Sequence, residues 1–295
     1  MSTKTKAPWA YLNDEEIKLK NLNPENKSGY LNENYHLFYI KDKKEISFNY
    51  HYHDFHKLVV LIHGKVNYEI EGKSYELKNN DILLVPMHKI HRPVIDPSVE
   101  YERLVLWISD AYFDKFTEEN TEIKSNILKA SLIRLKRELT KDLQKMLMDA
   151  YHCGNEDAFG AKILADSHME HFLVSLFRLL LSPDFKEDFS SITYDPKIDE
   201  IISYINKNLK ENLSNDDIAT RFYMSKYYLM HKFKEETGYS LHNYIEEKRL
   251  INATALLNSG KPVAEAFEQS GFKEYTTFLR AFKKKYRMSP SSYTK

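Results

Sequence analysis

The chain of 295 residues contains a single cysteine, Cys153, so no disulfide bond can form within it. A chain without disulfides fits a reducing cytosol. Hydrophobic residues make up 42% of the sequence, a normal value for a globular protein. At this length we expect two domains joined by a connector, each with an apolar core of its own.

Long apolar runs are also absent. The N-terminal stretch MSTKTKAPWAYLNDEE lacks the apolar segment of a secretory signal peptide. The most apolar stretch, 172–181, is interrupted by Arg178 and is far too short to span a bilayer. We therefore expect a cytoplasmic protein with no membrane partner.

An excess of charge of one sign is lacking as well, since 43 Lys and Arg balance 43 Asp and Glu. This balance argues against a uniformly basic nucleic-acid-binding protein. The positive charge is nevertheless concentrated near the C-terminus, because residues 221–295 hold 14 basic against 7 acidic side chains. A polyanion could bind to that part of the chain.

Short runs rich in β-branched and aromatic residues predict strands between residues 37 and 109. Turn residues separate them, as in His63-Gly64-Lys65 and Glu71-Gly72-Lys73. Many closely spaced strands without intervening helices are typical of a small barrel or sandwich. The predicted strands are 46–51, 58–62, 66–70, 82–85 and 104–108.

Apolar residues then recur at steps of three and four from Ile123 to Ala150, which predicts an amphipathic helix. A second helical run, 161–181, is apolar over a wider arc than one buried stripe needs. It could pack on the β-rich part or offer a second apolar face to another subunit. Residues 182–196 have the composition of a linker.

The last hundred residues contain an internal repeat. A shift of 49 positions aligns Leu229 with Phe278, Phe233 with Phe282, and Tyr244 with Tyr293. A repeated helical unit of nearly fifty residues indicates duplication of one small module.

Each unit has the pattern of two short helices joined by a tight turn. Ser214 and Ser225 are the expected N-caps in the first unit, and Gly271 permits the turn in the second. The second helix of each unit buries its apolar residues and leaves basic and hydrogen-bonding side chains outside. This is the helix-turn-helix arrangement, whose second helix fits the DNA major groove.

Residues 197–295 resemble the DNA-binding domain of the AraC/XylS family of bacterial transcription regulators. The matching stretches are LSNDDIATRFYMSKYYLMHKFKEETGYSLHNYIEEKRLINATALL and GFKEYTTFLRAFKKKYRMSPSSY. Two positions depart from the family pattern. Ala266-Phe267 stands where the family has Ile-Ala, and Arg287 stands where it has glycine.

The resemblance and the helix pattern together predict a set of DNA contacts on the two second helices. Two such helices about 34 Å apart would meet successive turns of the major groove. The predicted DNA-binding residues are Lys226, Tyr227, Tyr228, His231, Lys232, Lys273, Tyr275, Thr276, Arg280, Lys283 and Lys284.

Six histidines crowd the β-rich part: His51, His53, His56, His63, His88 and His91. This segment resembles the cupin barrel that many members of the family carry at the N-terminus. In metal-binding cupins, a His-x-His pair precedes a glutamate and a third histidine follows a proline. Lys57 occupies the glutamate position here, and a cation beside the ligands opposes a bound dication. We therefore predict no metal and no cofactor.

A small-molecule pocket is the preferred interpretation of this segment. Its residues offer hydrogen-bond donors, a cation and aromatic walls, which suit a sugar or a small anion. Satisfied core or surface histidines remain the plain alternative. The predicted ligand-binding residues are His51, His53, Lys57, Tyr68, His91, Arg103 and Trp107.

The sequence thus predicts an α+β multidomain protein. A cupin-like, effector-sensing β-barrel spans 1–110, a helical dimerisation region with linker spans 111–190, and an all-α double helix-turn-helix domain spans 191–295. The expected function is activation of transcription by binding to double-stranded promoter DNA. We expect the protein to act as a homodimer and not as an enzyme. The alternative is a metal-dependent cupin enzyme with a helical appendage.

Overall fold

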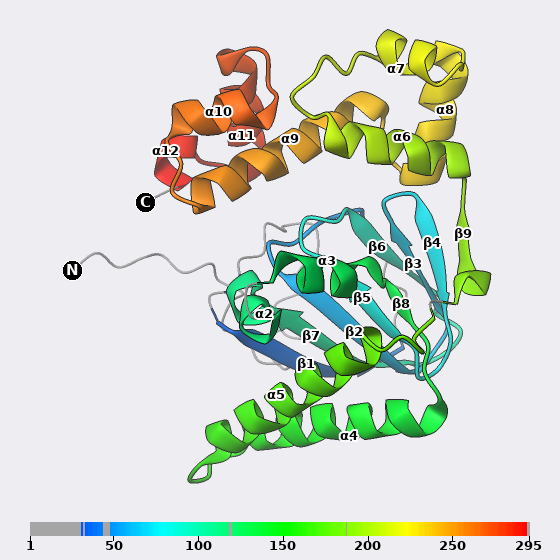
Figure 1. Ribbon diagram of the computed structural model, residues 1–295, viewed down its shortest axis with the longest axis vertical. Coiled ribbons are helices and arrows are strands. Elements are labelled where there is room, and N and C mark those ends of the chain that lie inside the picture. The colour runs from blue at the N-terminus through cyan, green and yellow to red at the C-terminus, as the bar shows by residue number, and fades with distance from the viewer. Residues whose placement is uncertain (1–30, 32, 44–47, 118–119, 187, 294–295) are drawn as a thin grey trace. The chain divides into compact units, whose positions relative to one another are not determined.

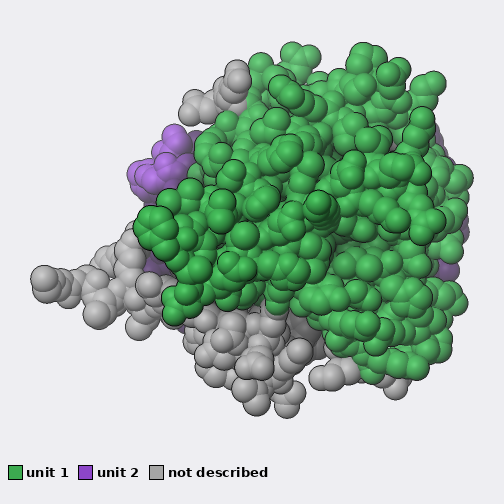
Figure 2. Space-filling view, turned by 90° about the horizontal axis from the view of Figure 1, so that it is seen from below, with its two compact units in different colours: residues 1–70, 74–192 green, residues 71–73, 193–295 purple. Residues whose placement is uncertain are grey.

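The computed structural model describes residues 31, 33–43, 48–117, 120–186 and 188–293. The chain falls into two compact units (Figure 2). The first comprises residues 1–70 and 74–192, and the second comprises residues 71–73 and 193–295. No helix in the described part of the chain is both long enough and apolar enough to cross a membrane.

Two sheets form the β-rich part of the first unit (Figure 1). One has five strands, in the order β1 (Tyr35–Asp42), β7 (Tyr101–Ile108), β2 (His56–His63), β5 (Ile82–Val85) and β8 (Leu132–Ile133). The other has four, in the order β6 (His91–Ile95), β3 (Val66–Ile70), β4 (Lys73–Leu77) and β9 (Ile192–Tyr194). Among the described strands the two sheets are cupin-like in arrangement but do not close into one barrel.

Alternation along the central strands separates two apolar cores. On β7, Leu104 and Leu106 belong to the core between the five-stranded sheet and the helices, whereas Tyr101 and Val105 belong to the core between the two sheets. Successive side chains point to opposite faces of a strand. Trp107, which packs against the second core, therefore shares the inner face with residues 101, 103 and 105.

Helices cover the outer face of the five-stranded sheet (Figure 1). They are α2 (Asp110–Thr117), α3 (Thr121–Lys129), α4 (Arg137–Gly154) and α5 (Ala161–Leu180), followed by a 3₁₀ turn at Phe189–Ser191. The long helices α4 and α5 pack side by side and bury Leu147, Met169 and Phe172 completely. Burial of such side chains contributes about 1.5–3 kcal/mol each relative to exposure.

The prediction of one helix from Ile123 to Ala150 is wrong. α3 ends at Lys129, where Ala130 adopts an extended conformation with φ −78° and ψ 98°. Leu132 and Ile133 then pair with β5 as a short edge strand, and both are fully buried. The free energy gained by burying these two side chains in the sheet exceeds the helical preference of the sequence around them. The next helix, α4, begins only at Arg137.

The predicted strands 58–62, 66–70, 82–85 and 104–108 all lie within observed strands. The predicted strand 46–51 is not observed over its described part, where residues 48–50 are irregular and His51 forms an isolated bridge with His91. Residues 46 and 47 lie outside the described residues. β1, β4 and β6 were not predicted.

The second unit is helical from residue 196 onward. Its elements are α6 (Pro196–Lys207), α7 (Asn215–Arg221), α8 (Lys226–Thr237), α9 (Leu241–Asn258), α10 (Val263–Ser270), α11 (Tyr275–Tyr286) and α12 (Pro290–Tyr293). Within this unit, α9 runs from the α7–α8 pair to the α10–α11 pair (Figure 1). Its side chains Leu250, Ala253 and Leu257 enter the core that α10 and α11 build.

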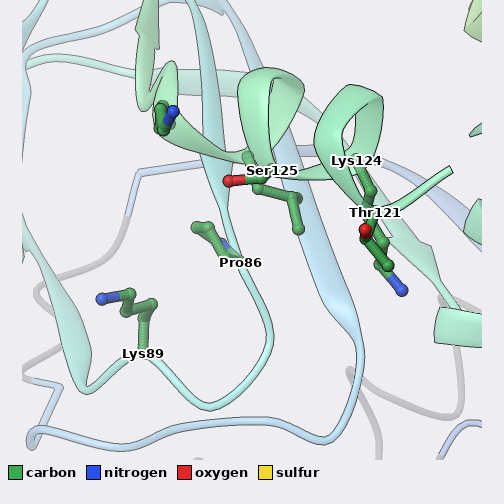
Figure 3. A pocket seen from close by; sticks show the side chains of 7 residues that line it. Pro86, Lys89, Thr121, Lys124 and Ser125 are labelled. Carbon is green, nitrogen blue, oxygen red and sulfur yellow. The ribbon is translucent and has the colours of Figure 1, made fainter. Parts of the chain in front are cut away.

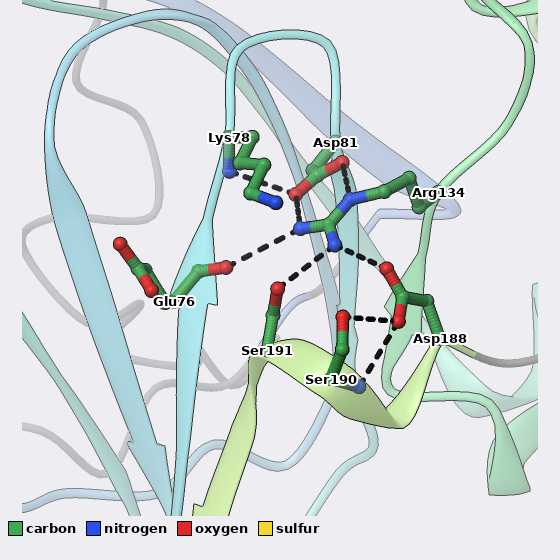
Figure 4. A network of polar contacts seen from close by, with 7 residues as sticks. All are labelled: Glu76, Lys78, Asp81, Arg134, Asp188, Ser190 and Ser191. Atoms are coloured by element: carbon green, nitrogen blue, oxygen red, sulfur yellow. Dashed lines mark hydrogen bonds and ion pairs between the residues drawn. The ribbon is translucent and has the colours of Figure 1, made fainter.

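Arg134 holds the segment at the end of the first unit against the β-rich part (Figure 4). Its guanidinium donates to both carboxylate oxygens of Asp81, at 2.9 and 2.6 Å, in the two-pronged geometry that strengthens such pairs. The same group donates to Asp188 and, at 2.8 Å, to the hydroxyl of Ser191. Since Asp81 is only 2% exposed, Arg134 is the cation that compensates a buried carboxylate.

Replacement of Arg134 by leucine should lower the free energy of unfolding by about 3 kcal/mol, because the Asp81 carboxylate stays buried without its cation. Urea denaturation of the purified chain measures this loss. Arg137→Leu is the matched control, since Arg137 is exposed and should change stability by no more than about 0.5 kcal/mol. Equal losses in the two variants would contradict the assignment.

Candidate DNA-binding and effector sites

The second helix of each repeated unit is fixed by two buried apolar residues one turn apart. Leu229 and Phe233 of α8 are fully buried, as are Phe278 and Phe282 of α11. Residues four apart lie on one face of a helix, so the remaining faces are turned toward solvent. Both predicted pairs are confirmed as core residues.

The aromatic residues that follow each unit pack in the same way. The ring of Tyr244 meets Phe233 edge-on, with centroids 5.4 Å apart and planes at 73°. Tyr293 meets Phe282 at 5.3 Å and 85°. These four residues are partners in the sequence repeat, so the duplication extends to the geometry of the core.

The expected N-caps begin the helices of the first unit. The hydroxyl of Ser214 accepts a hydrogen bond from the backbone N–H of Asp217 at 3.1 Å. Ser225 accepts one from Tyr228 at 3.2 Å. Each bond satisfies an amide that has no partner inside its helix, and together they define the turn that presents α8.

Ten of the eleven predicted DNA-binding residues have exposed side chains, and the eleventh, Lys232, is half-buried. Lys232 lies 2.6 Å from Glu236 and 3.4 Å from Glu235, and the hydrogen bond with Glu236 raises its pKa above the usual range. Its charge is thus neutralised by its own helix. The exposed residues are Lys226, Tyr227, Tyr228, His231, Lys273, Tyr275, Thr276, Arg280, Lys283 and Lys284.

Tyr223 escaped the sequence analysis, and Lys285, at the end of its helix, was not included in the predicted DNA-binding set. Tyr223, in the turn between α7 and α8, is 95% exposed and has a left-handed backbone with φ 55°. Lys285, beside the predicted Lys283 and Lys284, pairs with Glu247 of α9 at 2.9 Å. Exposure of Tyr223 depends on the turn conformation, for which the sequence carries no clear signal.

Gly271 forms the turn between α10 and α11 and has a positive φ of 95°. A Cβ atom at this position would lie 2.0 Å from the carbonyl oxygen of Leu209. The same carbonyl accepts a hydrogen bond from Arg249 of α9 at 3.0 Å. Glycine therefore allows the loop before α7 to reach the turn of the second unit.

Arg287 ends α11 in the left-handed conformation, with φ 59°. Its repeat partner in the first unit is Gly238, which ends α8 with φ 74°. The expected left-handed turn thus forms although the glycine is missing. A non-glycine residue in this conformation is strained by about 1–2 kcal/mol.

The structure divides the six histidines of the β-rich part into two groups. His51, His53 and His91 come together, and each offers one ligand nitrogen within 4.8 Å of the others. His88 instead lies 3.1 Å from the carboxylate of Asp54, and His63 is exposed.

His56 is held as a neutral ring. Its Nδ1 accepts a hydrogen bond from the backbone N–H of Met87 at 3.2 Å, so its Nε2 carries the proton and donates to Asp110 at 2.9 Å. Burial lowers the pKa of His56 below its usual range. His56 is therefore an internal structural group of the described fold.

The predicted ligand-binding residues lie on the inner face of the five-stranded sheet, in the segment just before β2 and on the facing strands of the four-stranded sheet. The ring of Trp107 lies 6.2 Å from that of His53, and Trp107 pairs directly with Lys57 on the adjacent strand. The Lys57 ammonium lies 5.7 Å from the ring centre of Tyr68. Arg103 shares the face but donates to both oxygens of Asp42, at 3.0 and 3.2 Å.

A separate hollow of about 430 Å³ opens beside α3 (Figure 3). Lys124, on its wall, pairs with Asp110 at 2.6 Å and Asp114 at 2.7 Å, so its charge is balanced locally. None of the seven predicted ligand-binding residues lines this hollow. Its lining is Pro86, Lys89, Thr121, Lys124, Ser125, Leu128 and Lys129.

Comparison with known proteins distinguishes the same β-rich and helical parts of the chain. Residues 34–173 match the AraC-like ligand binding domain, and residues 218–295 match a helix-turn-helix domain. The HTH-type transcriptional activator RhaS of Salmonella paratyphi A is 23% identical over 249 residues, which are 83% of this chain and 87% of RhaS.

Two more relatives differ in how much of the chain they cover. The multiple antibiotic resistance protein MarA of Salmonella enteritidis is 34% identical over 97 residues, which are 32% of this chain and 76% of MarA. The solved structure of ToxT from Vibrio cholerae is 16% identical, covers 88% of this chain and 97% of its own, and has a TM-score of 0.33.

A ligand-binding β-rich domain followed by two helix-turn-helix units defines a DNA-binding transcription regulator that responds to a ligand. The chain belongs to the AraC/XylS family of transcription regulators.

Gly271→Ala should destabilise the second unit by about 3 kcal/mol or more, because it adds a clash with the Leu209 carbonyl to left-handed strain. Gly260→Ala is the matched control, since Gly260 has φ 84° but nothing within 4 Å of the added Cβ. The control should lose only about 1–2 kcal/mol. Urea unfolding followed by far-UV circular dichroism compares the two, and equal losses would contradict the clash.

Proposed function

We propose that α8 and α11 enter neighbouring major grooves of promoter DNA and that the β-rich domain binds the effector. The observation that carries the proposal is the duplication itself. Each unit buries one apolar pair and leaves hydrogen-bonding and basic side chains exposed on the same helix. A merely solvated helix face has no need of such a repeat.

The exposed residues divide by chemistry into base-reading and phosphate-binding groups. Arg280 can donate two hydrogen bonds to guanine, the commonest specific contact in the major groove. Lys283 and Lys284 lie in the last turn of α11 and suit phosphate oxygens, which fix the register without reading sequence. We propose DNA contacts for every residue of the predicted set except Lys232, whose charge Glu235 and Glu236 already balance.

The proposed effector is a small molecule such as a sugar or a small anion. Lys57 supplies a cation, Tyr68 and Trp107 supply aromatic surface, and the histidines supply hydrogen-bonding groups on the inner face of the first unit. Arg103 contributes to this site by pairing with Asp42, because the ion pair fixes the position of the Arg103 side chain on the inner face. Effector binding would shift the equilibrium between conformations that differ in DNA affinity.

We propose that the protein acts as a homodimer assembled through α4 and α5. Their partly exposed apolar residues exceed what packing on the sheet requires. An apolar surface of this kind is typical of a protein–protein contact. These residues are Leu139 on α4, Ile163, Leu164 and Val174 on α5, with Phe159 just before it and Leu181 just after it.

The remaining proposals follow from the regulator function. Domain limits of 1–110, 111–190 and 191–295 separate sensing, dimerisation and DNA binding. The protein would act in the cytoplasm, activate rather than repress transcription, and catalyse no reaction. Selection of bound DNA from a random library tests the core of this proposal. A regulator of this kind enriches two half-sites one helical turn apart. A helical protein that only assembles with other proteins enriches no DNA sequence.

Arg280→Ala should weaken binding to the selected site by about 1–3 kcal/mol while leaving binding to random DNA unchanged. Lys283→Ala should weaken binding to all sequences alike and lower the slope of log affinity against log salt by about one unit. Lys210→Ala, an exposed lysine of the same unit, is the control and should do neither. Gel-shift titrations over a salt series separate these effects, and wild-type behaviour of both variants would remove α11 from the interface.

Lys57→Ala should abolish the effector response in a reporter assay while DNA affinity and thermal stability stay at wild-type values, because the substitution removes the ammonium group proposed to bind the effector. Lys65→Ala, an exposed lysine of the same domain that pairs with Asp96, should respond normally. An unchanged response of the Lys57 variant would exclude this side chain from the effector site.

A further inference from the structure

We propose that His51, His53 and His91 form a binding site for one divalent transition-metal ion. The inference deepens the proposed effector function of the β-rich domain, because it places the ion on the same inner surface. It rests on four observations: the convergence of three imidazoles, the fixed protonation of two of them, the rigidity of their backbone and the position of Lys57.

The three side chains converge from segments far apart in the sequence. Their ligand nitrogens all lie within 4.8 Å of one another, and the ring centroids are 4.4 Å apart for His51 and His91 and 5.1 Å apart for His53 and His91. A tetrahedral zinc ion with bonds of about 2.0–2.1 Å holds its ligands about 3.4 Å apart. Small rotations of the three rings would reach that spacing.

Hydrogen bonds fix the position of one proton on two of the rings. The Nδ1 of His51 lies 2.8 Å from the carbonyl oxygen of Asn49, and the Nδ1 of His91 lies 2.8 Å from that of Lys89. A carbonyl oxygen only accepts, so each Nδ1 carries a proton, and in the neutral ring the lone pair is on Nε2. The same arrangement orients the histidines of known metal sites and makes them better ligands.

The backbone around the cluster is held firmly. His51 and His91 exchange two backbone hydrogen bonds, at 2.9 and 2.8 Å, which lock their segments together. The carbonyl of His53 accepts a hydrogen bond from the backbone N–H of His88 at 2.9 Å. The ring of His53 stacks on Phe55, with centroids 4.5 Å apart and planes only 9° from parallel. The rings therefore have little conformational freedom to lose on binding.

Lys57 does not occupy the ligand set, contrary to the objection drawn from the sequence. Its ammonium lies over the ring of Tyr68, whose electron-rich face stabilises a cation. The three ligands are imidazoles without a carboxylate, a set that suits Zn²⁺, Ni²⁺, Cu²⁺ or Fe²⁺ and disfavours Mg²⁺ and Ca²⁺. Three ligands also leave a tetrahedral ion one position for water or an anionic group of the effector.

Metal analysis of the purified full-length protein tests the site. After treatment with EDTA, the protein is titrated with Zn²⁺ in a calorimeter, and Co²⁺ is added separately as a probe whose visible absorption reports tetrahedral nitrogen ligation. We expect one ion per chain. His51→Gln and His91→Gln should each weaken Zn²⁺ binding at least tenfold, whereas His63→Gln, which alters an exposed histidine of the same domain, should not.

Failure of Zn²⁺ to bind with one-to-one stoichiometry, or equal affinity in the His51→Gln and His63→Gln variants, would overturn the proposal. His51 is only half-buried, so its variant should fold, and far-UV circular dichroism verifies this. DNA binding is measured on the same samples. If the wild-type chain binds no Zn²⁺ but binds a preferred DNA, the result counts against the metal site alone. If the wild-type chain binds Zn²⁺ but prefers no DNA, the result counts against the regulator function.

Discussion

The exposed polar faces of α8 and α11 depend on one constraint, the burial of two apolar side chains a single turn apart on each second helix. Leu229 and Phe233 anchor α8, and Phe278 and Phe282 anchor α11. Once these faces are buried, the helical period forces the polar side chains outward. Core geometry thus orients these exposed faces, and the edge-on contacts of Tyr244 and Tyr293 with the two phenylalanines are the same in both units.

The sequence predicted an element correctly where its local residue pattern agreed with the contacts that the element makes in the folded chain. In the second unit the caps, the buried pairs and the turn glycine all act within a few residues, so the helices were predicted closely. In the first unit β4 and β6 are short and partly polar, with Lys73 and Pro93 among their residues, and they gave no strand signal. The helical spacing around Leu132 led to a wrong helix prediction. Leu132 pairs with β5, and this partner strand is too distant in the sequence to show in a local pattern.

Residue identity also revealed little about how charges are balanced. Lys232 was predicted to face DNA, yet two glutamates on its own helix neutralise it. Lys57 was taken as an obstacle to a metal, yet its ammonium points to Tyr68. The sequence placed His51, His53 and His91 in one segment of the fold. Only the carbonyl oxygens beside Nδ1 of His51 and His91 show which nitrogen of these two rings carries a proton. Such distinctions depend on distances between separate loops.

The two units, although duplicated, have glycine at opposite ends of their second helices. The first has Tyr223 in its turn and Gly238 after its helix, whereas the second has Gly271 and Arg287. The halves are therefore not interchangeable. Under the shift of 49 positions, copying the first turn into the second unit would place Phe222 at the position of Gly271. Its Cβ would then meet the Leu209 carbonyl, so recombination between the halves would destabilise the second unit. Each half can therefore accumulate substitutions of its own, and the two second helices need not keep the same exposed side chains.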